Sequence, residues 1–352
     1  MHPEPDQFAE LLARYEETEF GDRDIAAGRG LSGWQCINPF AADLLEDLAS
    51  TASRIDRVPY AYLEDDPNLS QQIISLHAEL DGVLPQEVYS GAGANSLLFA
   101  YAAMLRQANI PEVYYLPPLY FVLQYALRLF RIRARPVAAL HAFESGFSMN
   151  LPAKRSHLLL TDPVWYAGIS VPEAIIESIR VWQRATGSTV FVDGSFQYMP
   201  WDHHIGESTA NLDSNLTFRV VSPTKSLAIH GYRFAYVLLP QAEARSFANA
   251  HSTIYGSTNA DTLSFARHAI DAVRARTMTD KLTALAQARH QKLRELRFTE
   301  SSLQPDRGYF IFERVLDHTL QKDLMDGSFF DQTRFPQYAR LNLLSPALNA
   351  FV

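Results

Sequence analysis

The sequence predicts an α/β protein, with a large domain built on a mostly parallel sheet covered by helices and a smaller α+β domain. Three observations predict this class. The 352 residues, 47% of them hydrophobic, exceed one average domain. Strand-like and helix-like segments alternate from Ser70 to Leu239, which is typical of parallel sheets with right-handed crossovers. After Leu239 the pattern becomes mainly helical and ends in two strand-like segments.

The alternating region supplies the sheet. Residues 70–80 have helical spacing, and residues 86–108 predict a short strand, a glycine turn and an apolar helix. The following segments continue the alternation: a strand at 113–118, a helix at 120–130, a strand at 157–163, a helix at 171–186, and strands at 188–196 and 218–226. The apolar character of these strands predicts a sheet with helices on both faces.

Both ends of the chain are expected to form the small domain. Two helical and two strand-like segments follow Leu239, at 241–251, 262–296, 308–315 and 339–345. The first 45 residues contain no sheet pattern of their own, so we expect them to pack on this second unit. The predicted boundaries are residues 46–274 for the large domain, and residues 1–45 with 275–352 for the small domain.

Composition argues against several classes of protein. Lys and Arg total 31 against 39 Asp and Glu, giving a formal charge of −8, and no basic run is typical of nucleic-acid binding. Cys36 is the only cysteine, so the fold needs no disulfide. The amino terminus carries carboxylates where a secretory signal is basic and apolar, and no segment approaches the roughly 20 apolar residues of a membrane span. We expect a cytoplasmic protein without nucleic-acid or membrane partners.

The segment from Val220 to Val237 carries the most informative motif. Ser222, Lys225 and Arg233 follow a strand in the pattern S-x-x-K-x7-R. This pattern resembles the cofactor-anchoring segment of fold type I pyridoxal-phosphate enzymes, the aspartate aminotransferase superfamily. The resemblance implies that Lys225 forms a Schiff base with pyridoxal 5′-phosphate, while Ser222 and Arg233 hold its phosphate. A strand end with a solvated lysine and an unrelated arginine is the plainer alternative.

A second segment favours the functional interpretation. Asp193 ends an apolar strand 32 residues before Lys225, where the superfamily places the aspartate that pairs with the pyridine nitrogen. Such a carboxylate keeps the ring nitrogen protonated, so the ring accepts electrons when a bond to the substrate α-carbon breaks.

Other positions match the same family in order along the chain. Ser90, Gly91 and Ala92 resemble the phosphate-cup turn at a helix amino terminus, and Tyr120, in Pro118-Leu119-Tyr120, resembles the aromatic residue that stacks on the pyridine. Arg340 resembles the arginine that binds the substrate α-carboxylate in this family. Tyr62 resembles the tyrosine that contacts the cofactor phosphate in the neighbouring subunit. The resemblance implies a seven-stranded sheet, a small domain that closes over substrate, and a homodimer.

Two positions depart from the family pattern. Trp165, 28 residues before Asp193, stands where an asparagine usually donates to the phenolic oxygen of the cofactor, and Phe196 stands where a tyrosine is common. Losing both donors would raise the pKa of the internal Schiff base. His230, close to Lys225, is a candidate for additional acid–base chemistry.

The predicted function is an aminotransferase that binds an amino acid as an external aldimine, uses Lys225 to remove the α-proton and passes the amino group to a 2-oxo acid. The alternative is a pyridoxal-phosphate enzyme that does not transaminate, such as an amino acid oxidase or an enzyme of elimination or cyclisation. Two further alternatives are a non-catalytic regulatory descendant and an NAD-dependent oxidoreductase using Gly91 and Gly93. A metal site at Trp201–His204 is disfavoured because further ligands are lacking.

The departure at Phe196 gives a testable prediction. Phe196→Tyr should restore one donor to the phenolic oxygen, so the spectral titration of the cofactor-loaded variant should move to lower pH than in the wild type. A variant that folds, binds cofactor and titrates at the wild-type pH would show that residue 196 does not face that oxygen.

Overall fold

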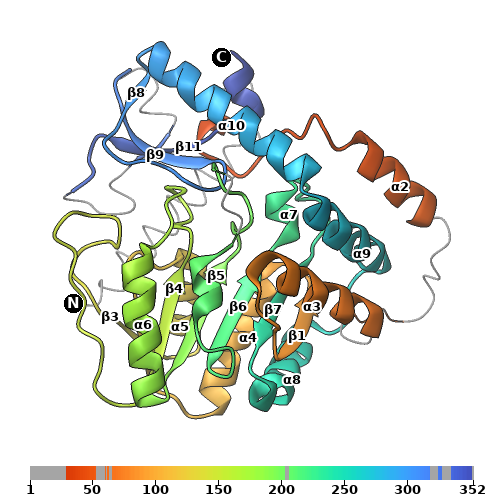
Figure 1. Cartoon of the computed structure of the whole chain (residues 1–352), viewed down its shortest axis with the longest axis vertical. Helices are drawn as coiled ribbons and strands as arrows, with labels where there is room; N and C mark the ends of the chain where they lie inside the picture. Colours follow the sequence, from red (N-terminus) through yellow and green to blue (C-terminus); the bar gives the residue numbers. More distant parts are fainter. Residues whose placement is uncertain are drawn as a thin grey trace.

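The chain forms two sheets, with the smaller one placed over one edge of the larger (Figure 1). The computed structural model describes residues 29–52, 60, 62, 66–202, 206–317, 324–326 and 334–350. Among these residues, the large sheet has seven strands and the small sheet has four.

The large sheet is mixed but mostly parallel, as predicted. Its strands run in the order β1-β7-β6-β5-β4-β2-β3: β1 (Glu87–Gly91), β2 (Glu112–Tyr115), β3 (Arg133–Pro136), β4 (His157–Thr161), β5 (Thr189–Gly194), β6 (Thr217–Val221) and β7 (Ala235–Leu239). Only β7 runs antiparallel to its neighbours, β1 and β6. Sequence reasoning missed β7 and the short edge strand β3. Residues 222–234 connect β6 to β7 and contain only the short helix α7 (Pro223–Ser226).

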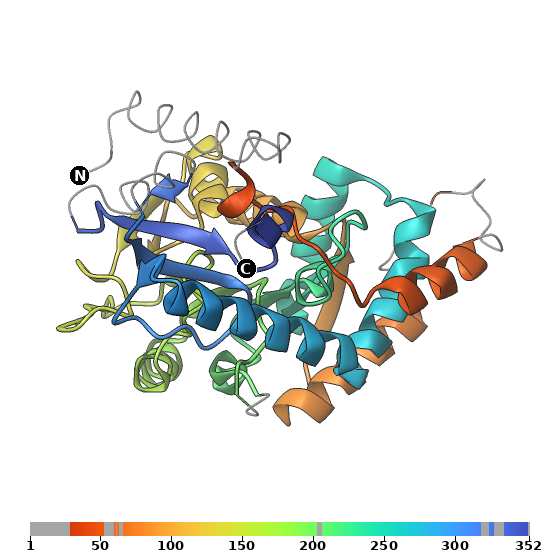
Figure 2. The ribbon, with the colours of Figure 1, turned by 90° about the horizontal axis from the view of Figure 1, so that it is seen from above.

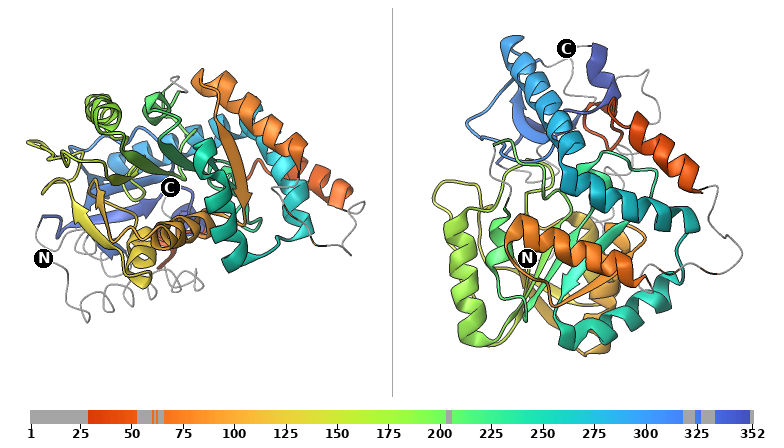
Figure 3. Two further views of the ribbon diagram at one scale, coloured as in Figure 1. Left: turned by 90° about the horizontal axis from the view of Figure 1, so that it is seen from below. Right: turned by 45° about the vertical axis from the view of Figure 1, so that its right-hand side comes forward.

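Helices cover both faces of this sheet (Figures 1 and 3). One face packs against α4 (Ala94–Gln107), α5 (Phe121–Leu129) and α8 (Ala244–Tyr255). The other packs against α3 (Pro67–Asp81), α6 (Glu173–Thr186) and α9 (Ala260–Ala275). Because side chains alternate along a strand, Phe191 joins the first layer while Val190 and Val192 join the second. This burial on both faces explains the continuous apolar runs of the central strands.

The small sheet is antiparallel in the order β10-β11-β9-β8. Its strands are β8 (Thr299–Glu300), β9 (Phe310–Val315), β10 (Met325–Asp326) and β11 (Tyr338–Asn342). The predicted helical stretch at 262–296 is divided at Arg276, whose φ of 61° ends α9 before α10 (Thr277–Glu295) begins. The division of the chain into domains at residues 46 and 275 stays a prediction.

The described part of the amino-terminal segment lies between the sheets. The turn η2 (Arg29–Leu31) lies beside the terminal turn η7 (Pro346–Ala350), as Figure 2 shows, and the Ile37 amide donates to the Leu344 carbonyl at 2.8 Å. The helix that follows, α2 (Ala42–Ala52), instead packs with α9. The segment before α2 therefore joins the small sheet to the large one.

A buried histidine supports the start of α4. His251 lies with Nδ1 3.1 Å from the Tyr89 hydroxyl and Nε2 3.2 Å from the Ser96 hydroxyl. Burial lowers the pKa of His251 to about 4, so the imidazole is neutral at pH 7. The His251 ring also leaves no space for a side chain at position 91, because a Cβ on Gly91 would lie 2.8 Å from His251 Nε2.

We expect His251 to make folding sensitive to acid. Its folded-state pKa of about 4 lies below the ordinary 6.5, so the unfolded chain binds more protons between these values and stability falls as pH drops through that window. The wild type should lose up to about 1.4 kcal/mol per pH unit more than His251→Gln in this range, measured by urea unfolding. Tyr89→Phe is the control, since it weakens the same contact and should keep the wild-type slope.

Candidate active site

A pocket opens where the strands β4, β5 and β6 end, facing the small sheet. It gathers four of the predicted site residues: Tyr120, Trp165, Asp193 and Lys225. Its other lining residues are Trp34, Ala94, Asn95, Thr161, Pro163, Ser195 and Phe196. These residues come from six separate segments of the chain, and all of them except Trp34 follow or end strands of the large sheet.

Asp193 is the buried acid of this pocket. It lies near the end of β5 opposite Thr161 of β4, and only 2% of its surface is exposed. Burial raises the pKa of Asp193, while hydrogen bonds from Ser195 and the charge of Lys225 act in the opposite direction. The Ser195 hydroxyl donates to Oδ1 at 2.6 Å and the Ser195 amide at 3.2 Å. Ser195 thereby orients the carboxylate towards the pocket.

Lys225 lies on α7, directly after β6. Pro223 begins this short helix and Ser222 caps it, with the Lys225 amide donating to the Ser222 carbonyl at 2.9 Å. The Lys225 Nζ lies 4.4 Å from the centroid of the Trp34 ring and 5.6 Å from that of Phe196. The amine therefore contacts aromatic faces, which stabilise a cation.

An anion-binding arrangement lies at the start of α4. Gly93 caps this helix with φ 89°, and a Cβ placed on it would lie 2.9 Å from Arg233 Nη2. The Arg233 guanidinium thus rests against a helix amino terminus whose first N–H groups have no partner within the helix. A side chain at position 93 would fill this cradle.

The predicted cup residues lie just before this helix terminus. Ser90 and Gly91 belong to β1, where they pair with Tyr236 and Ala235. The pocket is lined instead by Ala94 and Asn95. The last glycine before the apolar helix, Gly93, was the sequence signal that would have located the terminus.

Trp165 and Phe196, the two residues that depart from the family pattern, both line the pocket. Trp165 is 4% exposed and meets the Tyr120 ring at 5.3 Å, edge to face. The Tyr120 amide donates to the Thr161 hydroxyl at 3.0 Å, which fixes the start of α5 beside β4. Phe196 stacks on Trp34 at 6.1 Å between centroids.

Arg340 lies in the same aromatic cluster. This residue of β11 is fully buried, and its Cζ lies 4.7 Å from the Trp34 ring, 4.9 Å from Phe310 and 5.3 Å from Trp165. Its Nη2 donates to the Ser32 carbonyl. The small sheet therefore brings a cation to the same ring that contacts Lys225.

Solved structures share this architecture over nearly the whole chain. Substrate-bound BacF from Bacillus subtilis superposes with a TM-score of 0.75 at 13% identity, covering 99% of this chain and 94% of that chain. A probable N-succinyldiaminopimelate aminotransferase from Thermus thermophilus gives 0.72 at 16% identity, with 97% and 98% covered. YbdL from Escherichia coli, described as having a methionine aminotransferase function, gives 0.73 at 17% identity, with 99% and 96% covered.

The chain shares its fold with these solved aminotransferases. No protein-family model matches it, and no curated protein matches it. Among the described residues, no helix is both long enough and apolar enough to cross a membrane.

Several candidate residues lie outside the pocket of the aminotransferase fold. His230 places Nε2 3.1 Å from the Tyr309 hydroxyl, and burial together with the nearby Lys225 charge holds the pKa of His230 well below its usual range. Tyr62 is 38% exposed and contacts Tyr60, with 6.3 Å between ring centroids.

The segment Trp201–His204, disfavoured above as a metal site, is described only in part: the Trp201 indole donates to the Gly308 carbonyl at 2.8 Å. His203 and His204 lie outside the described residues, and the described ones contain no group of three or more acidic, histidine or cysteine side chains arranged to hold a metal.

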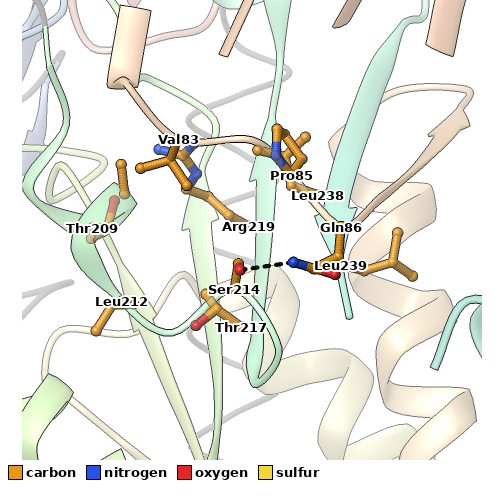
Figure 4. Close-up of a pocket in the computed structure, with 11 residues that line it drawn as sticks. Val83, Pro85, Gln86, Thr209, Leu212, Ser214, Thr217, Arg219, Leu238 and Leu239 are labelled. Atoms are coloured by element: carbon orange, nitrogen blue, oxygen red, sulfur yellow. Dashed lines mark hydrogen bonds between the residues drawn. The ribbon is translucent and has the colours of Figure 1, made fainter. Parts of the chain in front are cut away.

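A separate cavity lies beside β6 and β7, away from these residues (Figure 4). Arg219 points into it, and Gln86 Nε2 donates to the Ser214 hydroxyl at 3.5 Å. It shares no lining residue with the pocket of Lys225 and Asp193.

The affinity for an anion bound at the start of α4 should depend on the residue at position 93. We expect Gly93→Ala to weaken binding of pyridoxal 5′-phosphate by at least about tenfold and to affect phosphate-free pyridoxal less, because the added methyl group displaces Arg233 and its φ is unfavourable. Gly231→Ala is the matched control, since a Cβ there meets nothing within 4 Å. Equal losses for both ligands would contradict a phosphate role for this terminus. Calorimetric titration of the wild type and both variants with each ligand measures the six affinities.

Proposed function

We propose that this chain is a pyridoxal 5′-phosphate-dependent, aminotransferase-like enzyme acting on an amino acid and a 2-oxo acid. One observation carries the proposal: the amine of Lys225 and the buried carboxylate of Asp193 share a pocket beside a helix amino terminus that Arg233 contacts. The aminotransferase fold supports it at the level of architecture.

The donor groups of the site fit this cofactor. Arg233, Ser222 and the amides of Ala94 and Asn95 would hold the phosphate, because a guanidinium and a helix terminus both favour a dianion. The Tyr120 ring would stack on one face of the pyridine, and the Asp193 carboxylate would pair with the pyridine nitrogen. Lys225 would meet its aldehyde.

The bound cofactor would supply a ring that accepts the electron pair left when a bond to the substrate α-carbon breaks. Asp193 would hold a proton at the pyridine nitrogen, and its burial makes that interaction stronger than it is in water. The Lys225 amine would move the proton at the α-carbon, since its flexible chain ends inside the pocket. Arg340 would bind the α-carboxylate through its planar fork.

A specialised reaction on the same α-carbon is the second candidate. Its support is that Trp165 and Phe196 both line the pocket, so two positions that differ from the family pattern face the cofactor space. Product analysis with a panel of amino acids separates the candidates. Ammonia formed without a 2-oxo acid acceptor would rule out simple transamination, and peroxide formation would indicate oxidation.

A homodimer is proposed on the family resemblance, with Tyr62 directed to the neighbouring subunit. Tyr62 is exposed and does not line the pocket of its own chain, which is compatible with this role. A cytoplasmic location remains a prediction from the sequence.

Lys225 provides the direct test of the proposed function. Borohydride reduction of the yellow protein should attach a phosphopyridoxyl group to Lys225, and Lys225→Ala should abolish the adduct while the phosphate site still retains some cofactor. Peptide mass spectrometry identifies the modified residue. Lys154→Ala, which changes an exposed lysine outside the pocket, should leave the adduct unchanged. A colourless protein that cannot be reconstituted, or an adduct on Lys281, would overturn the assignment.

A further inference from the structure

Trp34 contacts two cations of the proposed active site, Lys225 and Arg340. Its ring centroid lies 4.4 Å from Lys225 Nζ and 4.7 Å from Arg340 Cζ, so these two groups lie no more than about 9 Å apart. An amino acid substrate would bring its amine to Lys225 and its carboxylate to Arg340. It would then contact the same two groups that the Trp34 indole contacts in this structure. The ring therefore stands where a substrate would have to bind.

Among the described residues, three aromatic rings lie close to the Arg340 guanidinium, and Trp34 is the most exposed of the three. Trp165 is 4% exposed and Phe310 2%, and Trp34 packs against the rings of both as well as that of Phe196. Trp34 is only half-buried and lies in a loop without regular secondary structure. A ligand can reach the guanidinium most easily by displacing Trp34.

The backbone around Trp34 is fixed by hydrogen bonds. Asn342 Nδ2 donates to the carbonyls of Gly33 at 2.8 Å and Gln35 at 2.9 Å, on either side of Trp34. Ser32 exchanges hydrogen bonds with Arg340 through its hydroxyl and its carbonyl. The main chain is thus held to β11, and rotation of the side chain alone would uncover the arginine.

We propose that the Trp34 indole occupies the carboxylate-binding position on Arg340 and must be displaced by the substrate. This inference rests on the proposed function to the extent that Arg340 is taken as the carboxylate site. The Trp34 ring lies within 5 Å of both Lys225 Nζ and Arg340 Cζ, so a carboxylate that binds Arg340 on the side facing Lys225 would occupy the space that the indole fills. The two occupants exclude each other, so the free enzyme binds a carboxylate more weakly by the fraction of time that the position is open.

Binding of propionate, an unreactive monocarboxylate, tests the proposal. Trp34→Ala should bind propionate about tenfold more tightly than the wild type, because two cation–π contacts no longer compete with the ligand. Trp34→Phe keeps a smaller ring and should lie between them. Calorimetry on the cofactor-free and the cofactor-loaded protein gives the affinities, and thermal unfolding checks that each variant is folded.

Two controls assign the effect to the proposed position. Arg340→Gln should remove propionate binding in both the wild-type and the Trp34→Ala backgrounds. Propionate should also make tryptophan fluorescence more accessible to acrylamide in the wild type and in Trp201→Phe, but not in Trp34→Phe.

The outcomes separate this inference from the proposed function. Propionate affinity that is unchanged or lower in Trp34→Ala would overturn it, as would binding that survives Arg340→Gln or is undetectable in every variant. If the protein takes up no pyridoxal phosphate, the proposed function fails, while titrations of the cofactor-free protein still decide the role of Trp34.

Discussion

Parallel strands that end at one edge of a sheet are the constraint on which this site depends. Neighbouring strands lie about 4.8 Å apart, so residues that follow two adjacent strands meet without long loops. Asp193 on β5 and Lys225 after β6 become neighbours in this way, although 32 residues separate them in the sequence. Thr161 and Trp165 reach the same edge from β4. Such an edge can hold an acid, an amine and an aromatic wall at fixed positions.

Burial of charge shapes the chemistry of this edge. The Asp193 carboxylate is nearly inaccessible, and Lys225 and Arg340 both lie against aromatic faces. In such surroundings electrostatic interactions are stronger than in water, and an uncompensated charge is costly. The rings of Trp34, Phe196 and Phe310 compensate the cations without neutralising them. The cations thus remain able to exchange an aromatic partner for an anionic one.

The small sheet and the amino-terminal segment complete the site. Arg340 comes from β11, Phe310 from β9 and Trp34 from the loop that precedes α2. Hydrogen bonds from Asn342 to the carbonyls beside Trp34 tie this loop to β11. Residues from opposite ends of the chain therefore control access to the same guanidinium.

The sequence by itself determined the features that are local. Strand and helix periodicity predicted the mostly parallel sheet, because burial on both faces leaves continuous apolar runs. The spacing of Asp193 and Lys225 placed both at strand ends, and the structure brings them into one pocket. The sequence placed the phosphate cup at Ser90–Ala92, whereas α4 begins after Gly93, the last glycine of the turn.

Only the tertiary structure decided the contacts between distant segments. β7 runs antiparallel to β1 and β6, and this pairing depends on how residues 222–234 run in space rather than on residue type. Trp34 carries no motif and stands 191 residues before Lys225, so nothing in its local sequence indicates the contact. Its position follows from packing of the amino-terminal loop against β11, and packing depends on which surfaces meet after the sheets have formed.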